Sequence, residues 1–408
     1  MNPIKAIYCR AVQTVLRVAL PVLPYREPEV FHSCAELRTV FQKEAIRRVL
    51  IVTDTGIVRS GIAAQLEAVL DENDITYAVY DQTRPNPTVI NVEQALSLYQ
   101  RYRCQALIAI GGGSSMDCAK AVGARLARPG TPLGTLKGTL RILRKLPTLI
   151  AIPTTAGTGS ETTLAAVITD TQAQHKYVMN DFVLIPRYAV LDARLTLSLP
   201  PHLTATTGMD ALTHAVEAYI GRSTTRQTRQ KALEATRLVF ANVERAYRSG
   251  QDYEARRNML TAAYRAGVAF SRSYVGYVHA VAHSLGGQYN IPHGLANAVL
   301  LPYVLESYGS CIHRKLHDLA VAAGVAGAQE SDAAAAAKFI RAIRQLNARM
   351  GIPETLEGIR PEDIPVMAAH AEQEANPLYP VPRLMTQEEL MGFYTQVARK
   401  ESHGQQAS

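Results

Sequence analysis

The fold class follows from one stretch of the sequence, Ala106-Leu107-Ile108-Ala109-Ile110-Gly111-Gly112-Gly113-Ser114. The apolar run 106–110 predicts a parallel strand that is covered on both faces. The three glycines allow positive φ angles and let a phosphate approach the backbone without meeting a Cβ atom. A helical pattern begins after them, and the free N–H groups of a helix start attract anions. Strand, glycine turn and helix in this order predict a diphosphate site, although the loop matches neither a Walker motif nor a complete Gly-x-Gly-x-x-Gly motif.

Residues 48–192 alternate short β-branched runs with helical patterns. Besides 106–110, the sequence predicts strands at 48–54, 76–80, 148–152, 163–169 and 188–191. Asn86-Pro87-Thr88 is expected to begin a helix, because Asn or Thr can cap free N–H groups and Pro suits a first turn. This alternation predicts a parallel sheet that is wrapped by helices.

The character of the sequence changes after Pro200-Pro201, and helical periodicity continues through residues 203–400. We therefore divide the chain into four parts: a basic N-terminal extension that is expected to be helical (1–29), a dinucleotide-binding α/β domain (30–199), an all-helical domain (200–400) and a tail expected to be disordered (401–408). Ligands of open parallel sheets bind at the carboxyl ends of the strands. The ligand site is expected there, in the cleft between the two domains.

The composition is that of an ordinary globular protein of 408 residues, with 47% hydrophobic and 19% charged residues. No run of about 18 apolar residues occurs, so no membrane-spanning helix is expected. Five cysteines without a close pair argue against a disulfide scaffold and fit a reducing cytoplasm. The net charge of +8 is scattered over helical patterns, for example at Arg222, Arg226, Arg229 and Arg237, which favours solvated faces over a polyanion partner. No zinc-finger or RNP-like motif occurs, and no nucleic-acid partner is expected.

The first 26 residues contain no acidic residue. Their apolar residues lie on one stripe of a helix: Ile4, Ile7, Val15, Leu16, Ala19 and Leu20. This pattern predicts an amphipathic helix. We favour a helix that packs on the body of the protein or on a partner subunit. Contact with a membrane surface and a targeting segment are the alternatives.

Two features near strand ends bear on the nucleotide. The loop 153–161 follows a predicted strand, and its threonine hydroxyls and amides are suited to line a cofactor. Asp54 ends another strand, where a carboxylate can accept hydrogen bonds from a ribose diol and repel a 2′-phosphate. On this interpretation the cofactor is NAD and not NADP. An Asx turn is the alternative for Asp54.

The helical half holds residues with the chemistry of metal ligands. Asp210 and His214 are one turn apart on a predicted helix, so both project from one face. Three of the chain's 11 histidines, His279, His283 and His293, share one apolar stretch. Nitrogen and oxygen ligands without thiolate suit a divalent iron or zinc ion. Spacing alone does not choose three of the four histidines, although the i, i+4 pair His279 and His283 is the simplest choice. Ordinary buried histidines and an Asp–His hydrogen bond are the alternatives.

From about Val30 to Tyr394 the sequence resembles the iron-containing (group III) alcohol dehydrogenase family. The motifs that carry the resemblance are Asn86-Pro87-Thr88, Gly111-Gly112-Gly113-Ser114, Pro153-Thr154-Thr155-Ala156-Gly157-Thr158, Gly208-Met209-Asp210-Ala211-Leu212-Thr213-His214, and His279-x-x-x-His283 through Pro292-His293-Gly294. The resemblance implies a Rossmann-like α/β domain followed by an all-helical domain, the architecture shared with dehydroquinate synthase, with NAD(P) and one metal in the cleft.

Carried over position by position, the resemblance implies that Asp210, His214, His279 and His293 are the metal ligands. His283 is then the catalytic histidine that faces the nicotinamide and the substrate, which overrules the simple i, i+4 pairing. The implied cofactor contacts are Asp54, Asn86, Gly112, Gly113, Ser114, Thr154, Thr158, Val167 and Lys176.

Three features depart from the family pattern. Ser115 stands where the family's glycine loop usually continues with proline. Near the expected substrate cavity, Ala375-Asn376-Pro377-Leu378-Tyr379-Pro380 replaces the more usual Asn-Pro-Arg. The basic extension precedes the common core. The second of these departures leaves the choice of substrate open.

The implied function is reversible hydride transfer between a small primary alcohol or diol and NAD. A divalent metal, Fe²⁺ or else Zn²⁺, polarises the alcohol or aldehyde oxygen, and His283 relays the released proton. The alternatives are a polyol (glycerol-type) dehydrogenase or a dehydroquinate synthase-like lyase on the same fold, and a non-enzymatic basic binding protein. The resemblance also implies a homodimer or larger homo-oligomer, and the cysteines favour a cytoplasmic protein.

Overall fold

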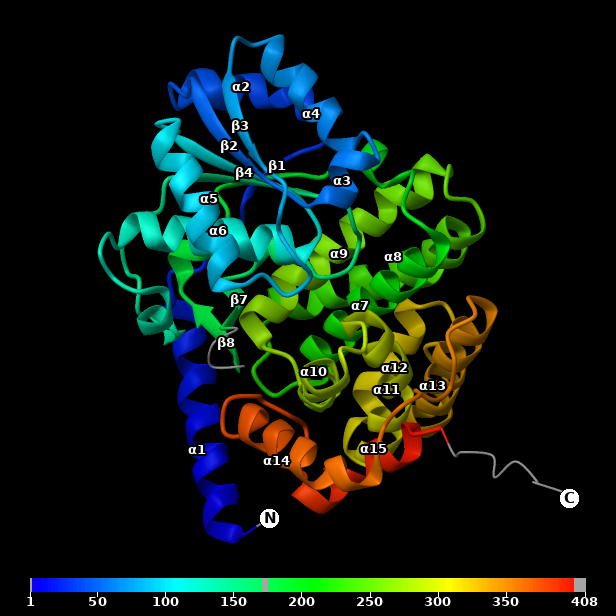
Figure 1. Ribbon diagram of the computed structural model, residues 1–408. Helices are drawn as coiled ribbons and strands as arrows, with labels where there is room; N and C mark the ends of the chain where they lie inside the picture. The colour runs from blue at the N-terminus through cyan, green and yellow to red at the C-terminus, as the bar shows by residue number, and fades with distance from the viewer. Residues whose placement is uncertain (1, 171–174, 400–408) are drawn as a thin grey trace, which may run out of the picture.

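The computed structural model describes residues 2–170 and 175–399. A six-stranded parallel sheet forms the centre of the first half of the chain (Figure 1). The strands lie in the order β1-β9-β6-β4-β2-β3. Their bounds are β1 (Glu29–Phe31), β2 (Arg48–Val52), β3 (Thr76–Tyr80), β4 (Ala106–Gly111), β6 (Thr148–Pro153) and β9 (Tyr188–Val190). The strands expected in these places are confirmed, whereas the short edge strand β1 was not predicted. The expected tail 401–408 lies outside the described residues.

The strand β4 lies in the middle of the sheet, paired with β2 on one side and β6 on the other, and all its residues are buried. Leu107 and Ala109 belong to the core beneath α5 (Val89–Arg101) and α6 (Gly113–Ala127). Ile108 and Ile110 belong to the core beneath α2 (Leu37–Lys43) and α4 (Ile62–Asp71). In Figure 1 the two pairs of helices lie on opposite sides of the strands. The prediction of a strand covered on both faces is confirmed.

The strand expected at 163–169 does not join the parallel sheet, so that part of the prediction was wrong. Ala165–Asp170 (β7) pairs antiparallel with His175–Asn180 (β8), which also pairs with the short strand β5 (Gly138–Thr139). The physical reason lies in the burial of β7. Its fully buried residues alternate with partly exposed ones, as in a sheet with one covered face, whereas β4 is buried throughout.

The helix α5 begins at the expected motif, but the residues have other roles than predicted. Thr88 caps the helix by accepting from the N–H of Asn91, whose side chain accepts from the N–H of Thr88 in return. Pro87 precedes the cap and does not occupy the first turn. Asn86 takes a left-handed φ of 58° and turns the chain toward the glycine loop.

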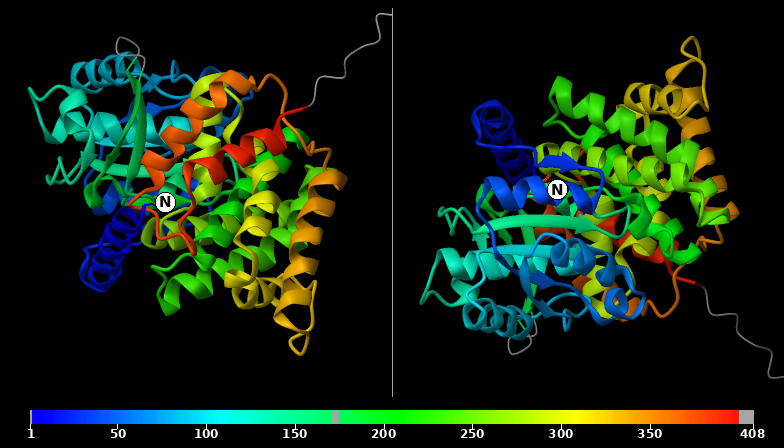
Figure 2. Two further views of the ribbon diagram at one scale, coloured as in Figure 1. Left: turned by 90° about the horizontal axis from the view of Figure 1, so that it is seen from below. Right: turned by 90° about the horizontal axis from the view of Figure 1, so that it is seen from above.

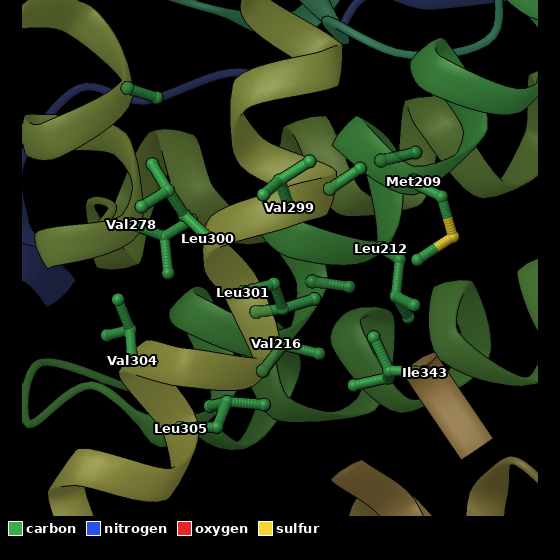
Figure 3. Close-up of a cluster of buried hydrophobic side chains, with 14 of the residues drawn as sticks. Met209, Leu212, Val216, Val278, Val299, Leu300, Leu301, Val304, Leu305 and Ile343 are labelled. Atoms are coloured by element: carbon green, nitrogen blue, oxygen red, sulfur yellow. The ribbon is translucent and has the colours of Figure 1, made fainter. Parts of the chain in front are cut away.

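Helices make up the second half of the chain and surround α7 (Pro201–Ile220), as Figure 3 shows for part of their core. Met209, Leu212 and Val216 of α7 pack in one buried cluster with side chains of the neighbouring helices. These helices are α8 (Arg226–Arg248), α9 (Tyr253–Ser273), α10 (Tyr277–Tyr289), α11 (His293–Tyr308), α12 (His313–Ala322), α13 (Asp332–Arg349), α14 (Ile364–Ala375) and α15 (Gln387–Val397). The predicted α/β half followed by a helical half is confirmed. The exact domain boundaries stay predictions.

The N-terminal extension forms the expected helix, α1 (Pro3–Ala19), which stands out from the edge of the molecule (Figures 1 and 2). The helix packs on the body of the protein through its polar face, whereas much of its apolar stripe points outward. The outward face carries side chains that are 58–77% exposed: Ile4, Ile7, Tyr8, Val15 and Val18. The inward face buries Cys9 and Gln13. The helix is oriented by polar contacts with the body, and these leave the apolar stripe uncovered.

None of the helices in residues 2–170 and 175–399 combines the length and the apolarity that a membrane crossing requires.

The first half of the chain also contains the short helix α3 (Thr55–Arg59), which follows β2.

A buried charge network fastens α6 to the chain that follows β6. The Lys120 ammonium group is fully buried, and its three N–H groups face five oxygen atoms of residues 160–165 at distances of 2.7–3.1 Å. Asp117, one turn earlier on α6, accepts from the Ser160 hydroxyl and from the Val167 N–H. Burial lowers the pKa of Lys120 to about 8, although the Asp117 carboxylate opposes this shift.

Lys120→Met is expected to lower the free energy of unfolding by about 3 kcal/mol or more, because it leaves buried oxygen atoms and Asp117 without their cation. Urea denaturation followed by circular dichroism measures the change. Lys137→Met, at an exposed lysine, is the control and should stay within about 0.5 kcal/mol of the wild type. Equal stability of the two variants would show that the network does not hold α6.

Candidate active site

The glycine turn between β4 and α6 brings the backbone close to its neighbours. Gly111 has a φ of 148°, and a Cβ atom at this residue would lie 2.5 Å from the Ser115 hydroxyl oxygen. Glycine tolerates this φ angle and, because it has no Cβ atom, also the close approach to Ser115. Gly112 immediately precedes the first turn of α6, so the free N–H groups of the helix start follow directly. The turn therefore has the backbone geometry of an anion site.

The loop that follows β6 lies beside this turn. The Thr154 N–H donates to the Gly111 carbonyl at 3.0 Å, which extends the pairing of β4 with β6. A Cβ atom on Gly113 would lie 3.1 Å from the Thr158 methyl group. On the other side, the Asn86 N–H donates to the Ser114 hydroxyl at 3.3 Å. The structure thus brings together six of the expected cofactor residues at the carboxyl ends of the strands: Asn86, Gly112, Gly113, Ser114, Thr154 and Thr158.

Asp54 also reaches this turn, and its two carboxylate oxygens have different surroundings. Oδ1 accepts from the N–H groups of Gly56 and Ile57 and caps α3. This local turn is the alternative that the sequence left open. Oδ2 lies 3.5 Å from the position that a Cβ atom of Gly111 would occupy, so it faces the glycine turn. One carboxylate oxygen therefore caps α3, and the other is oriented toward the turn where the cofactor is expected.

A cleft of about 530 Å³ lies between the two halves of the chain. From the first half it is lined by Arg84, Asn86 and Lys176, and from the second half by residues 286–290 at the end of α10. Burial lowers the pKa of Lys176. Val167, the remaining expected cofactor residue, is tied to α6 through the Asp117 carboxylate at 3.1 Å.

The expected metal ligands converge in the helical half. One ligand atom from each of Asp210, His214, His279 and His293 lies within 4.8 Å of the other three. Asp210 Oδ1 lies 3.4 Å from His293 Nε2 and 3.9 Å from His279 Nε2, and Oδ2 lies 4.0 Å from His214 Nδ1. Asp210, His214 and His279 are buried, and His293 is partly exposed. A carboxylate and three imidazoles at such distances form a donor set for a divalent ion.

Two polar side chains that the sequence analysis did not identify orient these groups. Glu217 Oε2 lies 2.6 Å from His279 Nδ1, which directs Nε2 into the cluster. Glu217 also accepts from the N–H groups of Gly276 and Val278, and burial raises its pKa to about 7. Asn297 Nδ2 donates to Asp210 Oδ1 at 2.7 Å. Glu217 follows Asp210 and His214 by seven and three residues on the same helix, a spacing that would have allowed its prediction.

The donor set fits a metal ion on a further observation. His214 Nδ1 is buried and, within the described residues, has no hydrogen-bond partner, although it points toward the Asp210 carboxylate at 4.0 Å. A buried imidazole nitrogen without a partner is costly for a folded protein. A cation between these groups would remove that cost and balance the buried carboxylate.

Gly157 joins the metal-type cluster to the nucleotide-type loops. A Cβ atom at this residue would lie 2.7 Å from the Thr207 side chain and 2.8 Å from the Thr207 carbonyl oxygen on α7. The close approach brings the loop against α7 three residues before Asp210. The same loop carries Thr154 and Thr158 beside the glycine turn, so the two halves of the site share one loop.

His283 lies beside the cluster but is not one of the four converging residues. Its ring centroid is 5.1 Å from that of His293, and its Nδ1 lies 2.6 Å from Glu374 Oε1. The same oxygen accepts from the Tyr379 hydroxyl at 2.7 Å. Desolvation opposes the charges of this pair, but their attraction raises the pKa of His283 and lowers that of Glu374. The four residues whose ligand atoms converge are thus the ones that the resemblance implies, and His283 lies beside them.

Comparisons with known proteins agree with this geometry. The sequence model "Iron-containing alcohol dehydrogenase" matches residues 30–193, and the model "Fe-containing alcohol dehydrogenase family, C-terminal" matches residues 204–398. Alcohol dehydrogenase 4 of Saccharomyces cerevisiae is 39% identical over 81% of this chain and 85% of its own length. The 1,3-propanediol dehydrogenase of Klebsiella pneumoniae is 38% identical over 86% and 91%. The NAD-dependent methanol dehydrogenase of Bacillus methanolicus is 35% identical over 82% and 88%.

A solved structure of 1,3-propanediol oxidoreductase superposes with a TM-score of 0.88 at 35% identity, covering 91% of this chain and 99% of the other. Fold and relatives together define an oxidoreductase of the alcohol dehydrogenase class. The chain belongs to the iron-containing alcohol dehydrogenase family. The predictions of family, fold class and enzyme class are confirmed, and the expected NAD and divalent metal agree with the family and its relatives.

Glu217→Gln is expected to lower the affinity for Fe²⁺ or Zn²⁺ by about 10- to 100-fold. The neutral amide replaces the carboxylate that accepts from His279 Nδ1, so the ring is held less firmly with Nε2 toward the metal. Equilibrium dialysis followed by elemental analysis measures the affinity. Glu72→Gln, at an exposed glutamate, is the matched control and should bind as the wild type does. Unchanged metal affinity in Glu217→Gln would mean that Glu217 does not orient a ligand.

Proposed function

We propose that this chain catalyses reversible hydride transfer between a small primary alcohol or diol and NAD, with one divalent metal ion, Fe²⁺ or else Zn²⁺. The observation that carries the proposal is the shared loop 154–158, which lies against the glycine turn and, through Gly157, against α7, the helix that carries Asp210 and His214. A dinucleotide and a metal ion would thus be held by one continuous site. The matched relatives named alcohol, methanol and 1,3-propanediol dehydrogenases support this substrate class.

The residues of the α/β half bind the cofactor in this proposal. The backbone of Gly112, Gly113 and Ser114 would hold the diphosphate at the start of α6. Asp54 Oδ2 would accept from a ribose diol, which favours NAD over NADP. Asn86, Thr154, Thr158, Val167 and Lys176 would line the remaining length of the dinucleotide up to the cleft between the halves.

The residues of the helical half bind the metal and handle the proton. Asp210, His214, His279 and His293 would hold the ion, with Glu217 and Asn297 orienting them. These residues would present the ion to the oxygen of an alcohol or aldehyde, for which it would supply Lewis-acid polarisation. Because Glu374 engages Nδ1 of His283, Nε2 is the ring nitrogen left for the substrate. His283 would accept the hydroxyl proton at Nε2 while Glu374 stabilises the charged ring.

We also propose that the chain forms a homodimer or larger homo-oligomer in the cytoplasm. The apolar outer face of α1 supports the oligomer, since monomers rarely leave such a stripe uncovered. The face carries no charge, because Lys5 turns to Glu372 and Arg10 to the carbonyls of residues 381 and 382. An uncharged apolar ridge suits a second copy of itself better than an anionic membrane. The cysteines, all free among the described residues, fit a reducing compartment.

His293→Ala is expected to abolish metal binding and NAD-linked alcohol oxidation together, with at least a 100-fold loss of kcat/KM, because one of four donors is removed. NADH absorbance with a panel of small alcohols and diols, and elemental analysis of the same sample, measure both properties. His32→Ala, at an exposed histidine, should leave both unchanged. A variant at His293 that keeps its metal and its activity would refute the ligand assignment.

The double variant Val15→Glu/Val18→Glu is expected to reduce the oligomer to a smaller species, because it places two charges in the apolar face of α1. Light scattering coupled to size-exclusion chromatography gives the molar mass. Arg17→Glu, on the same helix but away from this face, is the control. An unchanged mass in the double variant, or a monomeric wild type that sediments with phosphatidylglycerol vesicles, would contradict an α1-mediated oligomer.

A further inference from the structure

The segment 376–382, Asn376-Pro377-Leu378-Tyr379-Pro380-Val381-Pro382, forms one backbone hydrogen bond within itself, from the Val381 N–H to the Tyr379 carbonyl. Three of its seven residues are prolines, which have no N–H group, so a regular ladder or helix is excluded. Its carbonyl groups nevertheless need donors wherever they are shielded from water. The segment begins at the end of α14, whose residue Glu374 contacts His283. The remaining donors come from other parts of the chain, among them the Arg222 N–H, which donates to the Pro380 carbonyl at 2.7 Å.

The inward face of α1 supplies most of these donors. Gln13 Nε2 donates to the carbonyl oxygens of Tyr379 and Pro377, at 2.8 and 3.3 Å. Arg10 donates to the carbonyls of Val381 and Pro382, at 2.8 and 3.1 Å. The Arg10 guanidinium also donates to Gln13 Oε1 at 2.7 Å and fixes the amide orientation. The Gln13 side chain is only 3% exposed, so these bonds replace water completely.

The segment held in this way leads directly to the proposed catalytic histidine. The Tyr379 hydroxyl donates to Glu374 Oε1 at 2.7 Å, and that oxygen lies 2.6 Å from His283 Nδ1. The carbonyl of Tyr379 accepts from Gln13 Nε2 and from the Val381 N–H, and its hydroxyl donates to the carboxylate that orients the imidazole. A displacement of the Tyr379 backbone would therefore reach His283 through two hydrogen bonds.

We propose that Gln13 and Arg10 of the N-terminal extension are positioning residues of the active site, acting through Tyr379 and Glu374 on His283. The helix α1 lies outside both matched family ranges, 30–193 and 204–398, so this support is a device of the extension and not of the common core. The inference rests on the proposed function, in which His283 faces the substrate. It assigns the extension a role in the catalytic rate, in addition to any role in assembly.

The test uses Gln13→Glu, which keeps the shape of the side chain and its contact with Arg10 but removes both donors to the segment. Gln13→Met, of similar length and without charge, is the second variant. Thr14→Ala is the matched control, because Thr14 is exposed and bonds only within α1, to the Arg10 carbonyl. Hydrogen–deuterium exchange of peptides covering residues 376–385 reports on the segment directly. Peptides covering residues 209–220 of α7 report on global unfolding.

In both Gln13 variants, we expect the amides of 376–385 to exchange at least tenfold faster while those of 209–220 stay unchanged. The kcat/KM for the alcohol should fall about tenfold or more, because the histidine is no longer held in the reacting geometry. The dissociation constant for NADH, from fluorescence titration, should stay within twofold of the wild type. Thr14→Ala should behave as the wild type in all three measurements.

Wild-type exchange of 376–385 in both Gln13 variants would overturn the proposal, as would faster exchange with an unchanged kcat/KM. Weaker NADH binding in proportion to the loss of kcat/KM would also overturn it, because the effect would then be a general loosening of the cleft. If the wild type shows no NAD-linked alcohol oxidation, the proposed function fails. The exchange experiment would then still decide whether α1 holds the segment.

Discussion

The structure depends on a buried carboxylate. Asp210 lies near the middle of α7, a helix that is largely buried among apolar side chains of the neighbouring helices. A charge in such a place destabilises the fold unless donors or a cation surround it. Asn297 from α11 donates to it, and imidazoles from α7, α10 and α11 close around it. The packing of these three helices is therefore tied to the chemistry of one side chain.

The same constraint explains how the two halves of the chain are joined. The loop after β6 reaches α7 at Gly157, where a Cβ atom would collide with Thr207, three residues before Asp210. The loop continues to Ser160, whose hydroxyl group contacts Lys120 and Asp117 of α6, the helix that follows the glycine turn. One loop thus couples the proposed metal site to the proposed cofactor site. Displacement of either half would disturb both.

Much of this arrangement could be predicted from the sequence, because its signals are local. A wholly apolar strand followed by three glycines predicts β4 and its turn, and Asp210 with His214 marks one face of a helix. The partners Glu217, Asn297 and Glu374 were missed because polar residues on helices are mostly solvated, and only the tertiary packing shows that these are buried or paired. The inward turn of the polar face of α1 was missed for a similar reason. Periodicity identifies an apolar stripe on a helix. It does not show that polar side chains on the opposite face donate hydrogen bonds to the carbonyl groups of a distant proline-rich segment.

The central claim is that the carboxylate and three imidazoles share one metal ion. X-ray diffraction from crystals of the purified protein, recorded on both sides of the iron and zinc absorption edges, tests it most directly. We predict a single anomalous peak enclosed by Asp210, His214, His279 and His293, with His283 turned toward Glu374. A peak coordinated by His283 in place of one of these histidines, or metal-loaded protein without a peak at this place, would contradict the account.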